Sequence, residues 1–179
     1  STLDWLKKEG LVLETDREID PRCEMTAIQK LLDGGPPIVF NNVKGYPNAR
    51  LATNVFGADK IGAKMFGCSD RKELKFRIHE GILKPPPPKI VKDAPCQEVV
   101  VDKDIDVWPI IPMIQHTQKD PGRTLGAGKT VASPNEFWGG WHISYNRMNF
   151  REDIPWKDKC TFQISPGSHT DQIATHFYK

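Results

Sequence analysis

The sequence has no apolar run long enough to cross a bilayer and no N-terminal secretory signal. Its four cysteines are widely scattered, and no two of them form a Cys-x-x-Cys pair. Such spacing disfavours a disulfide framework, so reduced thiols are the simplest interpretation. We therefore expect a cytoplasmic protein that does not bind membranes.

An excess of one charge sign is also missing. The formal net charge is +2 although 27% of the residues are charged, and the basic residues form no stripe. This balance does not favour binding to nucleic acid or to an acidic membrane surface. A hydrophobic fraction of 38% excludes a disordered chain and indicates a globular one.

Several signatures of common enzyme sites are absent. The run from Gly122 to Gly128 is superficially similar to a glycine-rich phosphate loop, but it has neither the Walker spacing nor the dinucleotide-binding fingerprint. We interpret it as a turn that enters a strand. No nucleophile elbow is present, and no cysteine and histidine are spaced as a catalytic pair.

Residues before the proline run 85–88 show a mixed helical and strand pattern. Capping residues, apolar spacing and glycines predict a short helix that begins near Thr2, a strand at 38–43, and helices at 21–32, 58–66 and 70–83. Ser69 is the expected cap of the last helix. The four consecutive prolines suit a stiff spacer and mark the expected module boundary.

Residues after the prolines are dominated by strand patterns. We expect strands at 97–101, 125–132, 142–150 and 160–165, a turn at 133–135, and a final helix from about residue 170 with Ser168 and Asp171 at its start. This half is typical of part of a barrel or a sandwich.

Two histidines, His142 and His169, adjoin the strand-like runs. A neutral imidazole binds divalent metals readily, but two histidines so far apart in sequence are equally typical of hydrogen-bonded structural residues. His116 precedes a turn-rich loop that could reach a site, and its role stays open. His79 and His176 are expected on helix surfaces.

Arg147 lies on the same predicted strand as His142. Alternation sends residues 143, 145 and 147 to one face and 142, 144 and 146 to the other. A bulge, or the strand end near Gly139 and Gly140, would be needed for the two side chains to converge on one ligand. The alternative is that Arg147 pairs with a surface carboxylate.

Eight segments, taken in their order along the chain, resemble the UbiD family of reversible non-oxidative decarboxylases. They are residues 18–21, 25–28, 40–46, 54–57, 95–98, 106–112, 141–148 and 165–169. The resemblance implies an α+β fold, with a small αβ N-terminal module over residues 1–94. The first part of a flavin-binding split β-barrel would follow over residues 95–179.

The resemblance also implies an activity and cofactors. Family members decarboxylate aromatic or α,β-unsaturated carboxylic acids with prenylated FMN, and a divalent metal, commonly manganese, bridges the cofactor phosphate to the protein with potassium nearby. In this chain Arg147 matches the arginine that works beside the reactive ring. The positions that match cofactor contacts, with Arg147 among them, are Thr130, Ile143, Ser144, Tyr145, Ser168 and His169.

The metal ligands implied by the resemblance are His142 and His169. The family usually has an asparagine where this chain has His142. That replacement favours an alternative: a non-catalytic binding or assembly subunit of a multi-subunit carboxylase, which keeps the fold without the cofactor.

The family's proton-transfer glutamates, a further metal-binding glutamate and its C-terminal oligomerisation domain match nothing in these 179 residues. We therefore expect an N-terminal portion or a split subunit of a carboxy-lyase. It would work with the missing C-terminal portion or a companion subunit, and as a homo-oligomer when complete.

Overall fold

The computed structural model shows two compact units, residues 1–112 and 113–179. It describes residues 2–87, 89–125, 130–135, 140–145, 147–155, 157–161, 164–168, 171–172 and 174–175. For strands β5 and β6 only the backbone is described.

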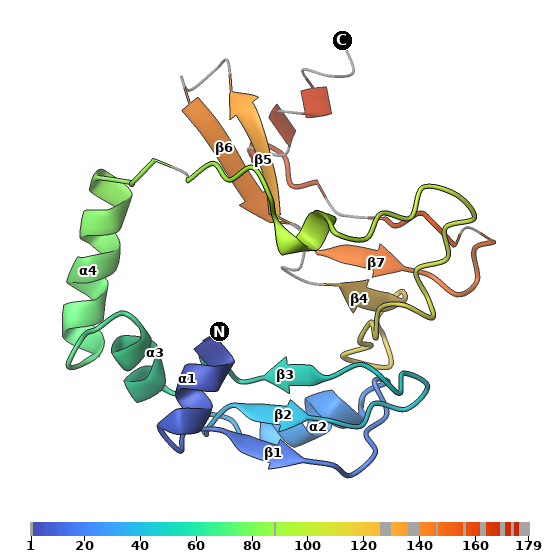
Figure 1. The fold of residues 1–179 in the computed structure, drawn as a ribbon, viewed down its shortest axis with the longest axis horizontal. Helices are drawn as coiled ribbons and strands as arrows, with labels where there is room; N and C mark the ends of the chain where they lie inside the picture. Colours follow the sequence, from blue (N-terminus) through green and yellow to red (C-terminus); the bar gives the residue numbers. More distant parts are fainter. Residues whose placement is uncertain are drawn as a thin grey trace. The chain divides into compact units, whose positions relative to one another are not determined.

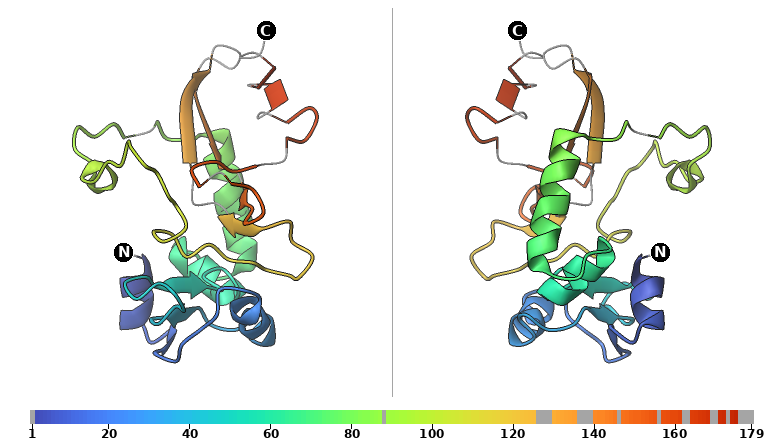
Figure 2. Two further views of the ribbon diagram at one scale, coloured as in Figure 1. Left: turned by 90° about the vertical axis from the view of Figure 1, so that its right-hand side faces the viewer. Right: turned by 90° about the vertical axis from the view of Figure 1, so that its left-hand side faces the viewer.

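A three-stranded sheet forms the centre of the first unit. Strand β1 (Leu13–Thr15) pairs in parallel with β2 (Ile38–Phe40), and β2 pairs antiparallel with β3 (Leu51–Thr53). Parallel neighbours need a long crossover, and helix α2 (Glu24–Leu31) provides it. Helices α1 (Thr2–Lys8) and α2 lie on opposite sides of this sheet (Figures 1 and 2).

The core of this unit comes from the elements that the apolar pattern predicted. All three residues of β2 are buried, and the helices on either side contribute Leu6 and Met25. Helix α2 begins three residues later than the predicted start at residue 21. Cys23 precedes it with a φ of 64°, a left-handed conformation that cannot belong to the helix.

Helices α3 (Asp59–Met65) and α4 (Arg71–Leu83) follow within about one residue of the predicted bounds. The cap of α4 is Asp70 rather than the predicted Ser69, because the Asp70 carboxylate accepts a hydrogen bond from the Glu73 amide at 2.9 Å. Ser69 instead donates to the Glu73 carboxylate through its amide and its hydroxyl. Both residues therefore stabilise the first turn.

The segment between α4 and the second unit contains one short 3-10 helix, Pro95–Gln97. The strand predicted at 97–101 is wrong: residues 98–101 are irregular, and Val99 and Val100 are 81% and 77% exposed. Strand propensity alone does not form a strand where no partner strand is available. No described helix is long and apolar enough to span a bilayer.

The described part of the second unit contains two antiparallel pairs. Strand β4 (Arg123–Leu125) pairs with β7 (Met148–Phe150), and β5 (Thr130–Asn135) pairs with β6 (Gly140–Tyr145). The predicted turn at 133–135 is therefore wrong, since those residues complete β5. The α+β class is confirmed, whereas a closed barrel is not formed by the described residues and stays a prediction.

Two more predicted elements are described only in part. In the predicted strand at 160–165, Thr161 forms an isolated bridge to Asn149, and residues 162 and 163 lie outside the described ones. Residues 171–172 and 174–175 of the last predicted helix are helical. The Ser168 hydroxyl accepts from the Asp171 amide at 3.2 Å, which is the capping contact that the sequence predicted.

Candidate functional site

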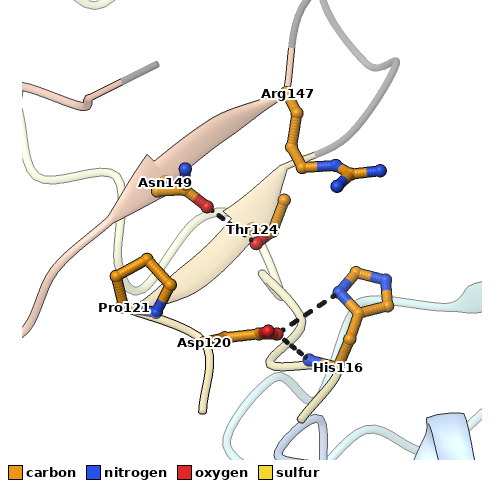
Figure 3. Close-up of a pocket in the computed structure, with 6 residues that line it drawn as sticks. All are labelled: His116, Asp120, Pro121, Thr124, Arg147 and Asn149. Atoms are coloured by element: carbon orange, nitrogen blue, oxygen red, sulfur yellow. Dashed lines mark hydrogen bonds and ion pairs between the residues drawn. The ribbon is translucent and has the colours of Figure 1, made fainter. Parts of the chain in front are cut away.

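A pocket of about 530 Å³ opens in the second unit, on the side of the β4–β7 pair that faces the loop leading into β4 (Figure 3). Its volume lies in the range of ordinary ligand pockets. The residues that line it are His116, Asp120, Pro121, Thr124, Arg147 and Asn149.

The floor of the pocket is a row of paired backbones. Thr124 on β4 pairs with Asn149 on β7, and single bridges extend the row to Ile114 on one side and to Thr161 on the other. Thr124 is 5% exposed, and its hydroxyl donates to Asn149 Oδ1 at 3.1 Å. This bond fixes the Asn149 amide, whose Nδ2 donates to no other described residue.

Residues of β7 alternate between the pocket and the core. Met148 and Phe150 are buried, while Asn149 and the preceding Arg147 line the pocket. A strand period of two puts residues 147 and 149 on one face, as Figure 3 shows. The exposed guanidinium of Arg147 forms no ion pair with any residue in the described ranges, so the surface-carboxylate alternative finds no support there.

The loop that enters β4 packs closely on β7. A Cβ atom at Gly122 would lie 2.3 Å from the carbonyl oxygen of Phe150, a distance that no real side chain occupies. Glycine at this position therefore lets the loop approach the strand and brings Asp120 and Pro121 to the pocket.

Asp120 organises that loop. Its carboxylate accepts hydrogen bonds from the amides of His116 and Thr117, at 2.8 and 3.0 Å, and from the Thr117 hydroxyl at 2.8 Å. These bonds, those from Thr117 above all, hold the pKa of Asp120 below its ordinary value. The His116 Nδ1 lies 3.9 Å from Asp120 Oδ2, within ion-pair distance but beyond hydrogen-bond distance.

The predicted strand at 142–150 is divided in two. Strand β6 ends at Tyr145, and Arg147 precedes β7, which belongs to a different sheet. The alternation that put His142 and Arg147 on opposite faces therefore does not apply, since it assumed one continuous strand. No bulge is needed to explain where Arg147 lies.

The backbones of five other predicted site residues lie on one ladder, and the convergence of their side chains on one site stays a prediction. Thr130 pairs with Tyr145 in the β5–β6 ladder, which also holds Ile143, Ser144 and His142 by their backbones. The side chains of these residues, and all of His169, lie outside the described parts. Ser168 is described, and its hydroxyl caps the terminal helical segment.

The metal site also stays a prediction. Among the residues with described side chains, no three histidine, cysteine, aspartate or glutamate residues lie close enough to hold a metal ion. Both predicted ligands, His142 and His169, are outside that set. The described pocket contributes donors from Arg147 and Asn149, which suit an anionic group rather than a cation.

Sequence reasoning missed most of the pocket. Asp120, Thr124 and Asn149 are not among the predicted site residues, and the sequence does not decide the role of His116. The Thr117-x-x-Asp120 spacing is a local signal of a side-chain-capped turn that could have been read. The contact between Thr124 and Asn149 joins residues 25 positions apart and depends on strand register, so the sequence gives no direct sign of it.

Two family descriptions match the chain. Residues 3–79 match the 3-octaprenyl-4-hydroxybenzoate carboxy-lyase N-terminal domain, and residues 89–179 match the Rift-related domain of the same carboxy-lyase. A phenolic acid decarboxylase of Bacillus subtilis is 30% identical over 173 residues, and a gallate decarboxylase of Lactiplantibacillus plantarum is 28% identical over 182. The matches cover 90% and 93% of the chain, but 36% of each relative.

Solved structures share the fold. The apo 3,4-dihydroxybenzoic acid decarboxylase of Enterobacter cloacae aligns with a TM-score of 0.84 at 24% identity, over 98% of this chain and 38% of that one. The UbiD-class enzyme HmfF of Pelotomaculum thermopropionicum, solved in complex with FMN, aligns with a TM-score of 0.79 at 23% identity. That alignment covers 92% of this chain and 36% of HmfF. By its two matched domains, the chain belongs to the UbiD family.

Proposed function

We propose that this chain is the N-terminal portion, or a split subunit, of a non-oxidative decarboxylase that acts on an aromatic or α,β-unsaturated acid with prenylated FMN. Family membership and relatives named as phenolic acid and gallate decarboxylases support the proposal. The observation that carries it is the exposed Arg147 at a pocket otherwise lined by polar groups and a proline.

The described pocket fits an anionic ligand. Arg147 offers a planar set of donors that matches a carboxylate or phosphate, and the fixed amide of Asn149 offers a second donor beside it. The negative charge of Asp120 is already stabilised by three hydrogen bonds within its own loop. Anion binding therefore does not require that Asp120 be neutralised.

When bound, prenylated FMN would accept the electrons that are released as carbon dioxide leaves the acid. Arg147 would bind the reacting carboxylate and orient it, since a guanidinium donates hydrogen bonds and keeps its charge. Developing negative charge beside it is stabilised electrostatically. The packed β4–β7 pair would hold this side chain in place during turnover.

The described pocket offers no general acid for protonating the product. Its carboxylate, Asp120, has a lowered pKa and stays ionised near neutral pH. Such an acid would come from the C-terminal portion or from a companion subunit. This division of residues agrees with the 36% of each relative that the chain spans.

The proposal also covers the position of the cofactor, the metal ligands and the oligomeric state. The cofactor would lie along β5 and β6, near Thr130, Ile143, Ser144 and Tyr145, within the first part of a split β-barrel that begins near residue 95. Manganese, with potassium nearby, would be held by His142 and His169. The completed protein would form a homo-oligomer.

The test compares two arginines that flank β7. In the complete protein loaded with prenylated FMN and manganese, Arg147→Ala should lower kcat/KM for a benzoic acid substrate by about 100-fold or more, because a charge-assisted contact is lost. Arg151→Ala is the matched control: Arg151 pairs with Asp153 and lies outside the pocket, so carbon dioxide release should be unchanged.

Two results would overturn the proposal: full activity of Arg147→Ala, or turnover by the isolated 179 residues. The second result would mean that the proton donor has been misplaced.

A further inference from the structure

His116 and Arg147 line the same pocket but come from different segments, the loop before β4 and the residue before β7 (Figure 3). Arg147 can donate hydrogen bonds but cannot accept them. An imidazole, in contrast, can donate from one nitrogen and accept at the other. The two residues therefore suit two different groups of one ligand.

Asp120 lies beside the Nδ1 side of the imidazole. Three hydrogen bonds fix its carboxylate, and Oδ2 lies 3.9 Å from His116 Nδ1. Of the two neutral tautomers, a negative charge on this side favours the one that carries its proton on Nδ1. The Nε2 atom then keeps its lone pair and accepts no hydrogen bond from any described residue.

A hydroxyl group is the ligand feature that such a nitrogen recognises. Thr124 and Asn149 bond to each other and three donors already engage Asp120, whereas no described residue donates a hydrogen bond to the His116 ring. The backbone bridge between Ile114 and Thr124 holds the start of its loop against β4. This anchoring keeps the imidazole at the pocket.

We propose that His116 binds a phenolic hydroxyl of the aromatic acid whose carboxylate contacts Arg147, and that Asp120 is a positioning residue that orients the imidazole. This inference rests on the proposed function and deepens it, because it narrows the substrate to hydroxybenzoic acids.

Binding, measured without turnover, tests the contact with the hydroxyl. Calorimetry on the complete protein would compare 3- and 4-hydroxybenzoate with the corresponding methoxybenzoates, which cannot donate a hydrogen bond. One hydrogen bond predicts about a 5- to 10-fold preference for at least one hydroxy acid. The preference should vanish in His116→Ala and return in part in His116→Gln, whose amide oxygen accepts hydrogen bonds.

The control for these variants is His79→Ala, because His79 is exposed on α4 and lies outside the pocket. It should keep the wild-type preference. Equal binding of hydroxy and methoxy acids by the wild type, or a preference that survives in His116→Ala, overturns the inference.

The role of Asp120 has its own readout. Nitrogen-15 spectra of the His116 imidazole report which nitrogen carries the proton. Asp120→Asn should reduce the Nδ1-protonated form, whereas Thr117→Val, which removes one hydrogen bond to the same carboxylate but keeps its charge, should leave it unchanged. Equal effects of both variants would show that Asp120 only holds its loop together, and would overturn its positioning role.

The inference and the proposed function fail separately. Loss of the hydroxyl preference in His116→Ala, together with no carbon dioxide release from any acid, would support the recognition and reject the decarboxylase. Decarboxylation by a protein whose affinity ignores the hydroxyl would reject the inference and keep the proposed function.

Discussion

Thr124 and Asn149 face each other across β4 and β7, and one hydrogen bond of 3.1 Å joins their side chains beneath the candidate pocket. Thr124 is buried, and its backbone also pairs with Ile114. The same residue thus holds together three segments of the second unit. A change at Thr124 tests whether the floor of the pocket contributes to stability.

Thr124→Val keeps the shape of the side chain and removes the hydroxyl. We expect a loss of about 1–2 kcal/mol in unfolding free energy, because Asn149 Oδ1 loses its partner in a half-buried site. Thermal unfolding measured by circular dichroism would detect it. Thr161→Val is the control: its exposed hydroxyl lies 3.5 Å from the Asn149 carbonyl oxygen, so its loss should cost under about 0.5 kcal/mol. Equal effects of the two changes would contradict this account.

Gly122→Ala should destabilise the β4–β7 pair by about 2 kcal/mol or more, because the new Cβ would meet the Phe150 carbonyl oxygen at 2.3 Å. Faster hydrogen exchange of the β4 amides would locate the effect.

Gly81 in α4, unlike Gly122, has room for an added Cβ atom. Gly81 has nothing within 4 Å of its Cβ position, so Gly81→Ala should stabilise the helix by about 0.5–1 kcal/mol. A destabilising Gly81→Ala, or a neutral Gly122→Ala, would show that the packing has been misread.

Acid should weaken the second unit through Asp120. The pKa of this carboxyl is lower in the folded chain than its ordinary value of 3.8, chiefly because Thr117 donates hydrogen bonds to it. Its contribution to stability is therefore fully present above the unfolded value and is lost as the pH falls through the folded one.

Unfolding free energies measured between about pH 5 and pH 2 should fall more steeply in the wild type than in Asp120→Asn. Asp20, Glu73 and Asp153 also have lowered pKa values, so the slope should decrease without reaching zero. Identical slopes in the two proteins would rule out this contribution of Asp120.

Metal binding separates the roles of His169 and Arg147. In the completed protein His169→Ala should lose manganese and cofactor together, whereas Arg147→Ala should keep much of both and lose turnover. Metal content by elemental analysis and flavin absorbance would measure these outcomes. Full metal occupancy in His169→Ala would contradict the assignment. So would a separation of more than about 6 Å between the His142 and His169 imidazoles in a metal-bound structure, since each ligand lies roughly 2 Å from the metal.

Local signals predicted the helices of the first unit well. Helix α4 was predicted to within one residue because its start depends on neighbours such as Asp70 and Glu73. The strand expected at 97–101 failed because valines favour a strand only when a partner is present. Arg147 was singled out for its residue type and its role stays a prediction, whereas the single strand predicted around it at 142–150 is wrong. The break between β6 and β7 depends on which strands they pair with, and pairing is not a local property.

The irregular segment that follows the 3-10 helix contains exposed valines that bear on aggregation. Val99, Val100 and Val101 form an exposed run that favours cross-β stacking between copies of a chain. Glu98 and Asp102 bracket this run with negative charges, the kind of residue that suppresses such stacking. We therefore expect these two carboxylates to limit association of the exposed run between copies of the chain. Replacing both by neutral residues should raise the tendency of the segment to aggregate.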